Sequence, residues 1–169
     1  MQKINPKELD RNAIQLIGEQ WMLVTAGSEK HFNTMTASWG GMGFLWNKPV
    51  AFVFVRPERY TFEFMEEYEM FTLTFPGAGQ RHALKVCGSQ SGRNTDKVAD
   101  AGLTPLITEQ GNVCFEGAEI VLECRTLYAD FMKEDKFTDD GPLMKWYGEH
   151  EGGLHKIYVA EIVNAWIKG

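Results

Sequence analysis

The sequence lacks several features that mark large classes of proteins. Its longest uninterrupted apolar run, residues 50–55, is far shorter than the ~20 residues that a membrane-spanning helix needs. Its first residues contain neither the apolar stretch nor the small-residue cleavage site of a secretory signal. Its three cysteines, Cys87, Cys114 and Cys124, are an odd number without a close pair, which argues against a disulfide framework. We therefore expect small core thiols in a cytoplasmic protein that does not cross a membrane.

An excess of positive charge is also missing. Lys and Arg number 17 against 23 Asp and Glu, which gives a net charge of −6. Nucleic-acid binding usually starts from a basic face, so we do not expect DNA or RNA as a partner. Apolar residues make up 44% and charged residues 24% of the 169 residues, the ordinary balance of a globular protein. No repeat or linker divides the chain, and we predict a single domain over residues 1–169.

Common catalytic signatures are incomplete. The segment 41–43 has two glycines but no third one at the dinucleotide-binding spacing, and Gln90 stands where a hydrolase elbow would place its serine. His150 and His155 are five residues apart, and the glycines between them disfavour the helix that would align them on a zinc ion. We therefore name no catalytic residue and no metal ligand. A bound cofactor that performs the chemistry is the interpretation that remains.

The pattern of apolar residues predicts mostly strands. A helix is expected from Tyr60 to Tyr68, and the strand after it alternates so that only one of its faces is apolar. Many strands with few, short helices indicate a mainly β protein, a closed or split barrel. The expected strands are 21–26, 32–38, 50–55, 70–75, 118–126 and 154–167, and the first two would form an antiparallel hairpin. Two further short helices are expected at 80–86 and 96–101, the second with Asn94 and Thr95 as possible cap residues.

One stretch, residues 33–43, has the composition of a binding rim. Small hydroxyl residues run into a tryptophan and then into glycines, so that backbone can come close to a ligand. A flat heteroaromatic ring would use backbone N–H groups, a hydroxyl from Thr36 or Ser38, and a wall from Met35 or Trp39. A glycine-rich turn without a ligand is the alternative.

Two other segments suit an anion. Residues 56–61 lead into a predicted helix start, where free N–H groups favour negative charge, and their possible phosphate contacts are Arg56, Arg59, Tyr60 and Thr61. Residues 89–97 again combine hydroxyls, a glycine and cations before a helix. Either segment alone is more often a solvated loop. Together with the rim they describe a ligand with a planar head and a phosphate tail, which fits FMN, although composition does not exclude pyridoxal phosphate.

The order of these motifs resembles the flavin reductase-like family, in particular its flavoredoxin branch. The resemblance rests on residues 33–43, 53–57, 59–61, 91–93, 96–97 and 155–158, and it extends over nearly the whole chain after the first fifteen residues. It implies an FMN-binding split β-barrel, usually a homodimer with the flavin held noncovalently near the subunit interface. It also implies that Thr36, Ala37, Ser38 and Trp39 line the isoalloxazine ring and that Arg56, Tyr60, Thr61, Ser91 and Lys97 surround the phosphate, with Met35 and Gly92 completing the expected cofactor-binding set.

The resemblance makes an FMN-dependent oxidoreductase the leading hypothesis. The donor would be NADH, NADPH or an electron-transfer partner protein, and electrons would pass through the flavin to an acceptor. Residues 39–46 are bulkier than the Ser/Thr/Pro-rich segment of relatives that reduce free flavin, which favours a tightly held FMN. A pyridoxine-phosphate-oxidase-like enzyme and a non-enzymatic flavin-binding module are the alternatives.

Overall fold

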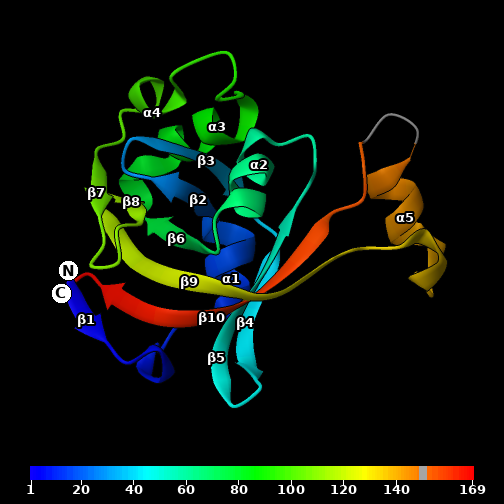
Figure 1. Ribbon diagram of the computed structural model, residues 1–169, viewed down its shortest axis with the longest axis horizontal. Coiled ribbons are helices and arrows are strands. Elements are labelled where there is room, and N and C mark those ends of the chain that lie inside the picture. Colours follow the sequence, from blue (N-terminus) through cyan, green and yellow to red (C-terminus); the bar gives the residue numbers. More distant parts are fainter. Residues whose placement is uncertain (149–151) are drawn as a thin grey trace.

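A computed structural model describes residues 1–148 and 152–169 of the chain (Figure 1). Its main element is an eight-stranded sheet in the order β3-β2-β6-β9-β10-β5-β4, with β1 paired to β10, and every pair is antiparallel. β7 and β8 form a separate two-stranded sheet. The strands are β1 (Gln2–Ile4), β2 (Met22–Ser28), β3 (His31–Ala37), β4 (Gly40–Leu45), β5 (Lys48–Val55), β6 (Met70–Pro76), β7 (Pro105–Ile107), β8 (Val113–Phe115), β9 (Ala118–Phe131) and β10 (Lys156–Ile167).

The helices are short, as expected for a mainly β protein, and that fold class is confirmed. No helix among the described residues is long and apolar enough to cross a membrane. The helices are η1 (Pro6–Glu8), α1 (Ala13–Gln15), the π-helical turn η2 (Leu16–Gln20), α2 (Tyr60–Glu67), η3 (Ala78–Gln80), α3 (Arg81–Ser89), α4 (Lys97–Asp100), η4 (Glu134–Lys136) and α5 (Asp140–Tyr147).

The predicted β2–β3 hairpin is present, and a glycine is needed at its end. Gly27 has φ = 120°, a conformation that side chains rarely adopt. A Cβ at Gly27 would lie 2.3 Å from the carbonyl oxygen of His31 on the facing strand. The close approach of the two strands therefore depends on the missing side chain.

The core lies on both faces of the central strands, which corrects one expectation. The Thr72 and Thr74 side chains of β6, predicted to lie on a polar face, have no exposed surface. The Thr72 hydroxyl donates to the carbonyl oxygen of Val113 in β8, 2.5 Å away. The small β7–β8 sheet therefore covers a face that alternation alone assigned to solvent.

Other differences concern segments with weak local signals. Residues 40–45 form strand β4, because Trp46 and Asn47 both adopt positive φ (50° and 60°) and close a two-residue turn into β5. The cap of α4 is also corrected: the Asp96 side chain accepts from the Ala99 N–H, whereas Asn94 and Thr95 had been expected to cap this helix. All three cysteines are free and buried, as predicted.

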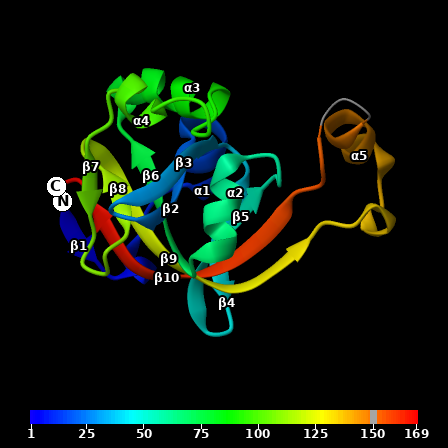
Figure 2. The ribbon, with the colours of Figure 1, turned by 45° about the horizontal axis from the view of Figure 1, so that its top comes forward.

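Strands β9 and β10 extend beyond the rest of the sheet as an arm that carries α5 at its far end (Figures 1 and 2). The arm is closed by a backbone hydrogen bond from the Met132 N–H to the His155 carbonyl oxygen, 2.9 Å long. As a result, α5 lies close to the residue that precedes β10. The sequence did not predict this helix.

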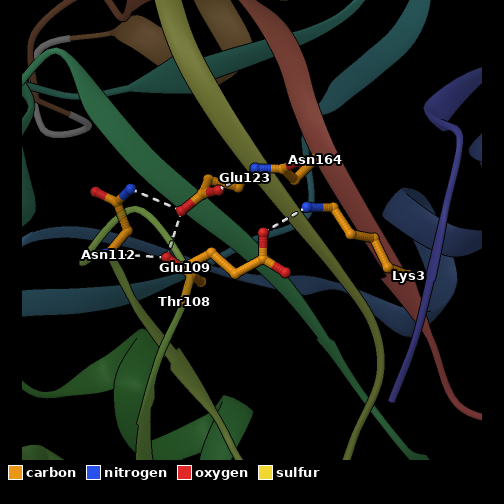
Figure 3. Close-up of polar contacts among 6 residues, drawn as sticks. All are labelled: Lys3, Thr108, Glu109, Asn112, Glu123 and Asn164. Atoms are coloured by element: carbon orange, nitrogen blue, oxygen red, sulfur yellow. Dashed lines mark hydrogen bonds and ion pairs between the residues drawn. The ribbon is translucent and has the colours of Figure 1, made fainter.

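A buried carboxylate joins the β7–β8 connection to the main sheet (Figure 3). Glu123 has no exposed surface, and its Oε1 accepts from the Asn112 amide at 2.8 Å and from the Thr108 hydroxyl. Its Oε2 accepts from the Asn164 amide of β10 at 2.6 Å. Neutral donors from three parts of the chain thus solvate this charge in place of water.

Candidate functional site

The sheet register creates a pocket where β3, β5 and β10 meet. β4 and β10 both pair with β5, at Gly40–Val53 and Lys156–Val55, so the end of β3 that leads into β4 lies near the start of β10. The pocket has a volume of about 180 Å³. It is lined by Met35, Thr36, Ala37, Ser38, Trp39, Phe54, Arg56, Arg59 and His155.

The rim predicted from the sequence lies along this pocket. Met35 and Ala37 belong to the buried core and therefore offer mainly backbone to the pocket. The Thr36 hydroxyl donates to the Leu84 carbonyl oxygen at 2.5 Å. The Ser38 hydroxyl makes no hydrogen bond to any residue in the described part of the chain. Ser38 is therefore the rim hydroxyl that is available to a ligand.

One wall of the pocket is aromatic, and helix α5 of the arm packs against it. The Trp39 ring lies 5.2 Å from the His155 ring and 5.1 Å from the Trp146 ring of α5, measured between centroids. Arg56 fixes the arm in this position, since its Nη2 donates to the Trp146 carbonyl oxygen at 2.7 Å and its guanidinium lies 5.1 Å from the centre of the Tyr147 ring. Arg56, predicted as a phosphate ligand, here joins the pocket to α5.

A half-buried cation, Arg59, lines the pocket, and a buried one, Lys97, lies near it. The Arg59 guanidinium lines the pocket and donates to the carbonyl oxygens of Cys87 (3.2 Å) and Gly88 (3.0 Å) in the last turn of α3. Lys97 is only 3% exposed, and its Nζ lies 3.5 Å from the Gln90 carbonyl oxygen. Neither cation forms an ion pair with a carboxylate in residues 1–148 or 152–169.

Burial makes the charged form of Lys97 unfavourable. Burial lowers the pKa of Lys97 to about 8, with Cys87 opposing the shift and Arg59 adding to it. Burial also lowers the pKa of Arg59, and it raises the pKa of the Cys87 thiol to about 11 despite the two cations. A buried lysine next to a half-buried arginine, without a carboxylate partner, is costly for the protein alone, and a bound anion would relieve that cost.

The remaining predicted residues form a cluster beside the pocket. The Asn33 amide donates to the Thr61 hydroxyl at 2.7 Å, and Thr61 has no exposed surface. A Cβ at Gly92 would lie 2.1 Å from Asn33 Oδ1 and 3.2 Å from Tyr60 Cδ1, so this backbone approach requires glycine. Ser91 accepts from a backbone N–H two residues on. As phosphate contacts, Tyr60, Thr61, Ser91 and Gly92 stay predictions.

His155 lies in the pocket wall rather than on the surface. It is 7% exposed, and its Nδ1 lies 2.7 Å from the Tyr147 hydroxyl. Burial lowers the pKa of His155 to about 4, with Arg56 adding to the shift and Glu58 opposing it. His155 is therefore neutral at pH 7. His150, the other half of the zinc spacing, lies outside the described residues, and those residues contain no group of three or more His, Cys, Asp or Glu that could hold a metal.

Arg59, which the sequence offers as a possible phosphate contact, lies in the pocket wall, whereas sequence reasoning missed Phe54 and the arm as parts of this site. The contribution of α5 had no local signal, because it depends on the length of the β9–β10 arm.

Comparison with known proteins agrees with this architecture. The family described as flavin reductase like domain matches residues 15–169. Flavoredoxin from Methanosarcina acetivorans has a similar structure, with a TM-score of 0.67 and 22% identity over 88% of this chain and 68% of that chain. An FMN-binding domain of a flavin reductase-like enzyme from Shewanella baltica gives a TM-score of 0.70 and 20% identity over 98% and 76% of the two chains.

A third similar structure is an NADH:FAD oxidoreductase from Streptomyces globisporus, with a TM-score of 0.65 and 19% identity over 88% of this chain and 75% of that chain. No curated protein matches the sequence. The chain belongs to the flavin reductase-like family, a family of flavin-related oxidoreductases. The resemblance seen in the motifs and the split β-barrel fold that it implied are thus confirmed, with flavoredoxins among the proteins of the same fold.

Proposed function

We propose that this protein is an oxidoreductase that holds FMN noncovalently and takes hydride from NADH or NADPH, or electrons from a partner protein. The observation that carries the proposal is the half-buried Arg59 guanidinium in the pocket wall, next to the buried Lys97, because neither cation has a carboxylate partner among the described residues. A planar ring fits the rim at 35–39, and a phosphate complements Arg59 and Lys97. Family membership and the printed names of the similar structures support a flavin.

The donor groups present fit FMN in chemical type. Backbone groups of residues 35–38 and the unpartnered Ser38 hydroxyl would bind the polar edge of the ring, and Trp39 would cover its face. Lys97 and Arg59 would hold the phosphate, each charge-assisted hydrogen bond contributing about 1.5–3 kcal/mol. The flavin supplies the redox chemistry, so that the protein binds it, orients it and stabilises the negative charge of its reduced state.

A nicotinamide as donor is supported by the name of the Streptomyces relative, and the aromatic wall offers it a stacking surface in Trp39 and Trp146. The same wall supports a flavin that stays bound through turnover. FMN is preferred over FAD because the two cations match a terminal phosphate.

We also propose that the protein acts as a homodimer. β4 ends the main sheet as an edge strand, and the β4–β5 turn exposes the apolar side chains of Phe44 (59%) and Trp46 (56%). Edge strands with such side chains are usually covered in the native state. Light scattering coupled to size exclusion should give twice the chain mass of 19.2 kDa, and a monomer would contradict this proposal.

The function is tested on the purified protein. We expect the absorption spectrum of FMN, or its appearance when FMN is added, and bleaching under anaerobic conditions on mixing with NADH or NADPH. Reduction by pyridoxine phosphate alone would instead identify the pyridoxine-phosphate-oxidase-like alternative. Bound flavin that neither nicotinamide nor a reduced ferredoxin or flavodoxin reduces would identify a flavin-binding module, and failure to bind any flavin would refute the proposal.

A further inference from the structure

The pocket contains His155, and a residue of the arm forms a hydrogen bond with one of its two ring nitrogens. The Tyr147 hydroxyl of α5 lies 2.7 Å from His155 Nδ1, and it also lies 3.7 Å from the Met132 sulfur. Tyr147 itself is held by Arg56, whose guanidinium lies over its ring. The described residues thus give the His155 ring one strong polar partner, and that partner comes from α5, at the far end of the arm (Figure 2).

The direction of this hydrogen bond follows from the strength of the two acceptors. A thioether is a weak acceptor at 3.7 Å, whereas an imidazole nitrogen at 2.7 Å is a strong one. The Tyr147 proton is also retained, because burial raises the pKa of its hydroxyl. Tyr147 therefore donates to Nδ1. Since neutral imidazole carries one proton, that proton must lie on Nε2 of His155.

Nε2 is the part of His155 that a ligand can reach. It has no hydrogen-bond partner in the described residues, yet it is not among the fully buried polar atoms without a partner, and the ring lines the pocket. The pocket thus presents an N–H donor next to the Trp39 ring and the Arg56 guanidinium. A donor beside an aromatic face suits a planar unsaturated ring that bears a carbonyl oxygen.

We propose that Tyr147 is a positioning residue that fixes His155 as the Nε2–H tautomer, so that His155 binds the carbonyl or carboxamide oxygen of the second substrate. This inference rests on the proposed function, because it concerns the substrate that exchanges electrons at the same pocket. Two sources share this chemistry: the carboxamide of a nicotinamide and the carbonyl of a conjugated aldehyde or ketone.

The first test measures the tautomer directly. Long-range nitrogen–proton NMR spectra of the protein should show His155 with its proton on Nε2, with His155→Gln used to assign the signals. Tyr147→Phe should shift this residue toward a mixture that includes the Nδ1–H form. Tyr128→Phe, which removes an exposed hydroxyl from the same arm, is the matched control and should change nothing. This measurement needs no flavin, so it remains decisive if the proposed function fails.

The second test measures recognition of the carbonyl oxygen. Dissociation constants are compared within two pairs, nicotinamide against 3-methylpyridine and benzaldehyde against toluene, in flavin-loaded protein. We expect His155→Phe to reduce the preference for the carbonyl-bearing member by about 3- to 10-fold, the worth of one neutral hydrogen bond. Tyr147→Phe should reduce it by a smaller factor, set by the fraction of His155 that the NMR spectra show as the Nδ1–H form, with flavin content unchanged. The pair that shows the effect identifies the source of the oxygen. His155→Gln, which keeps an N–H donor, should retain the preference, and His155→Phe should lose it.

An Nδ1–H tautomer in the natural protein, or an unchanged tautomer in Tyr147→Phe, would overturn the inference. An equal affinity for both members of each pair, in protein that carries flavin, would also overturn it. If Tyr147→Phe does not fold, the contrast between His155→Gln and His155→Phe decides the question. Absence of flavin in the natural protein would instead be a failure of the proposed function.

Discussion

Replacing Lys97 by methionine should have opposite effects on ligand binding and on the stability of the free protein. Lys97 is buried close to Arg59, and neither has a carboxylate partner among the described residues. Methionine fills a similar volume without the charge. If the pair exists to hold a phosphate, its removal weakens FMN but relieves a repulsion in the protein without ligand.

The magnitudes follow from the structure. One charge-assisted hydrogen bond is worth about 1.5–3 kcal/mol, so FMN should bind about 10- to 100-fold more weakly to Lys97→Met. Riboflavin, which lacks the phosphate, should be affected by less than about 3-fold. The pKa of Lys97 is lowered from 10.5 to about 8 in the folded chain, which corresponds to about 3 kcal/mol of unfavourable charging.

The sign of the pH effect is fixed by the same shift. Between pH 8 and 10.5 the unfolded chain holds the Lys97 proton more strongly than the folded chain does, so this residue makes stability rise with pH across that window. Lys97→Met should therefore be at least as stable as the natural protein at pH 7 and should lose this rise. FMN affinity of the natural protein should fall above pH 8, where Lys97 of the flavin-free protein loses its charge.

The assay is titration of flavin-free protein with FMN and riboflavin from pH 6 to 10, together with denaturant unfolding at the same pH values. Lys85→Met, which removes an exposed lysine from α3, is the control and should leave both flavin affinities unchanged. Equal losses of FMN and riboflavin affinity in Lys97→Met, or a clear destabilisation of the flavin-free protein at pH 7, would refute the reasoning.

Three further predictions concern other parts of the molecule. Glu123→Ala leaves the Asn112 and Asn164 amides without their acceptor and should lower the free energy of unfolding by about 3 kcal/mol or more. Glu123→Gln should lower it less, and equal thermal melting of Glu123→Ala and the natural protein would contradict this. His155 is faced by Arg56, Glu58 and Tyr147, and its pKa is lowered in the folded protein. The free energy of unfolding should therefore decrease as pH falls from 6.5 toward 4, because the unfolded chain takes up the proton first. An NMR titration midpoint of His155 above 6 would be inconsistent with this. Ser38→Ala should change the flavin potential or affinity, and an unchanged value of both would remove Ser38 from the ring contacts.

The sequence predicted those parts of the fold that local pattern controls. The β2–β3 hairpin and helix α2 lie close to the expected ranges, since apolar periodicity and turn residues define them. Strand β4 was missed because Trp46 and Asn47 are an unusual pair for a turn with positive φ. Burial of Thr72 and Glu123 could not be predicted, because the separate β7–β8 sheet and its connection cover them through side-chain hydrogen bonds between residues far apart in the sequence.

In the candidate site, too, local pattern predicted a segment but not the tertiary contacts of its residues. The rim at 35–39 was predicted from its composition, and the structure gathers it with Arg56 in one pocket. The roles of individual residues depend on partners distant in sequence. Arg56 bonds to α5, 90 residues away, and the Thr36 hydroxyl is bonded to the Leu84 carbonyl oxygen, 48 residues away. No local motif encodes such contacts, so the sequence can point to segments of the site but not to the partners of single residues.

A crystal structure of the protein grown with excess FMN tests the central claim most directly. The account predicts electron density for a flavin ring beside residues 35–39 and for its phosphate within hydrogen-bonding distance of Lys97 and Arg59. A flavin bound elsewhere, or a pocket between Trp39 and Arg59 that stays closed while FMN is present in excess, would contradict it.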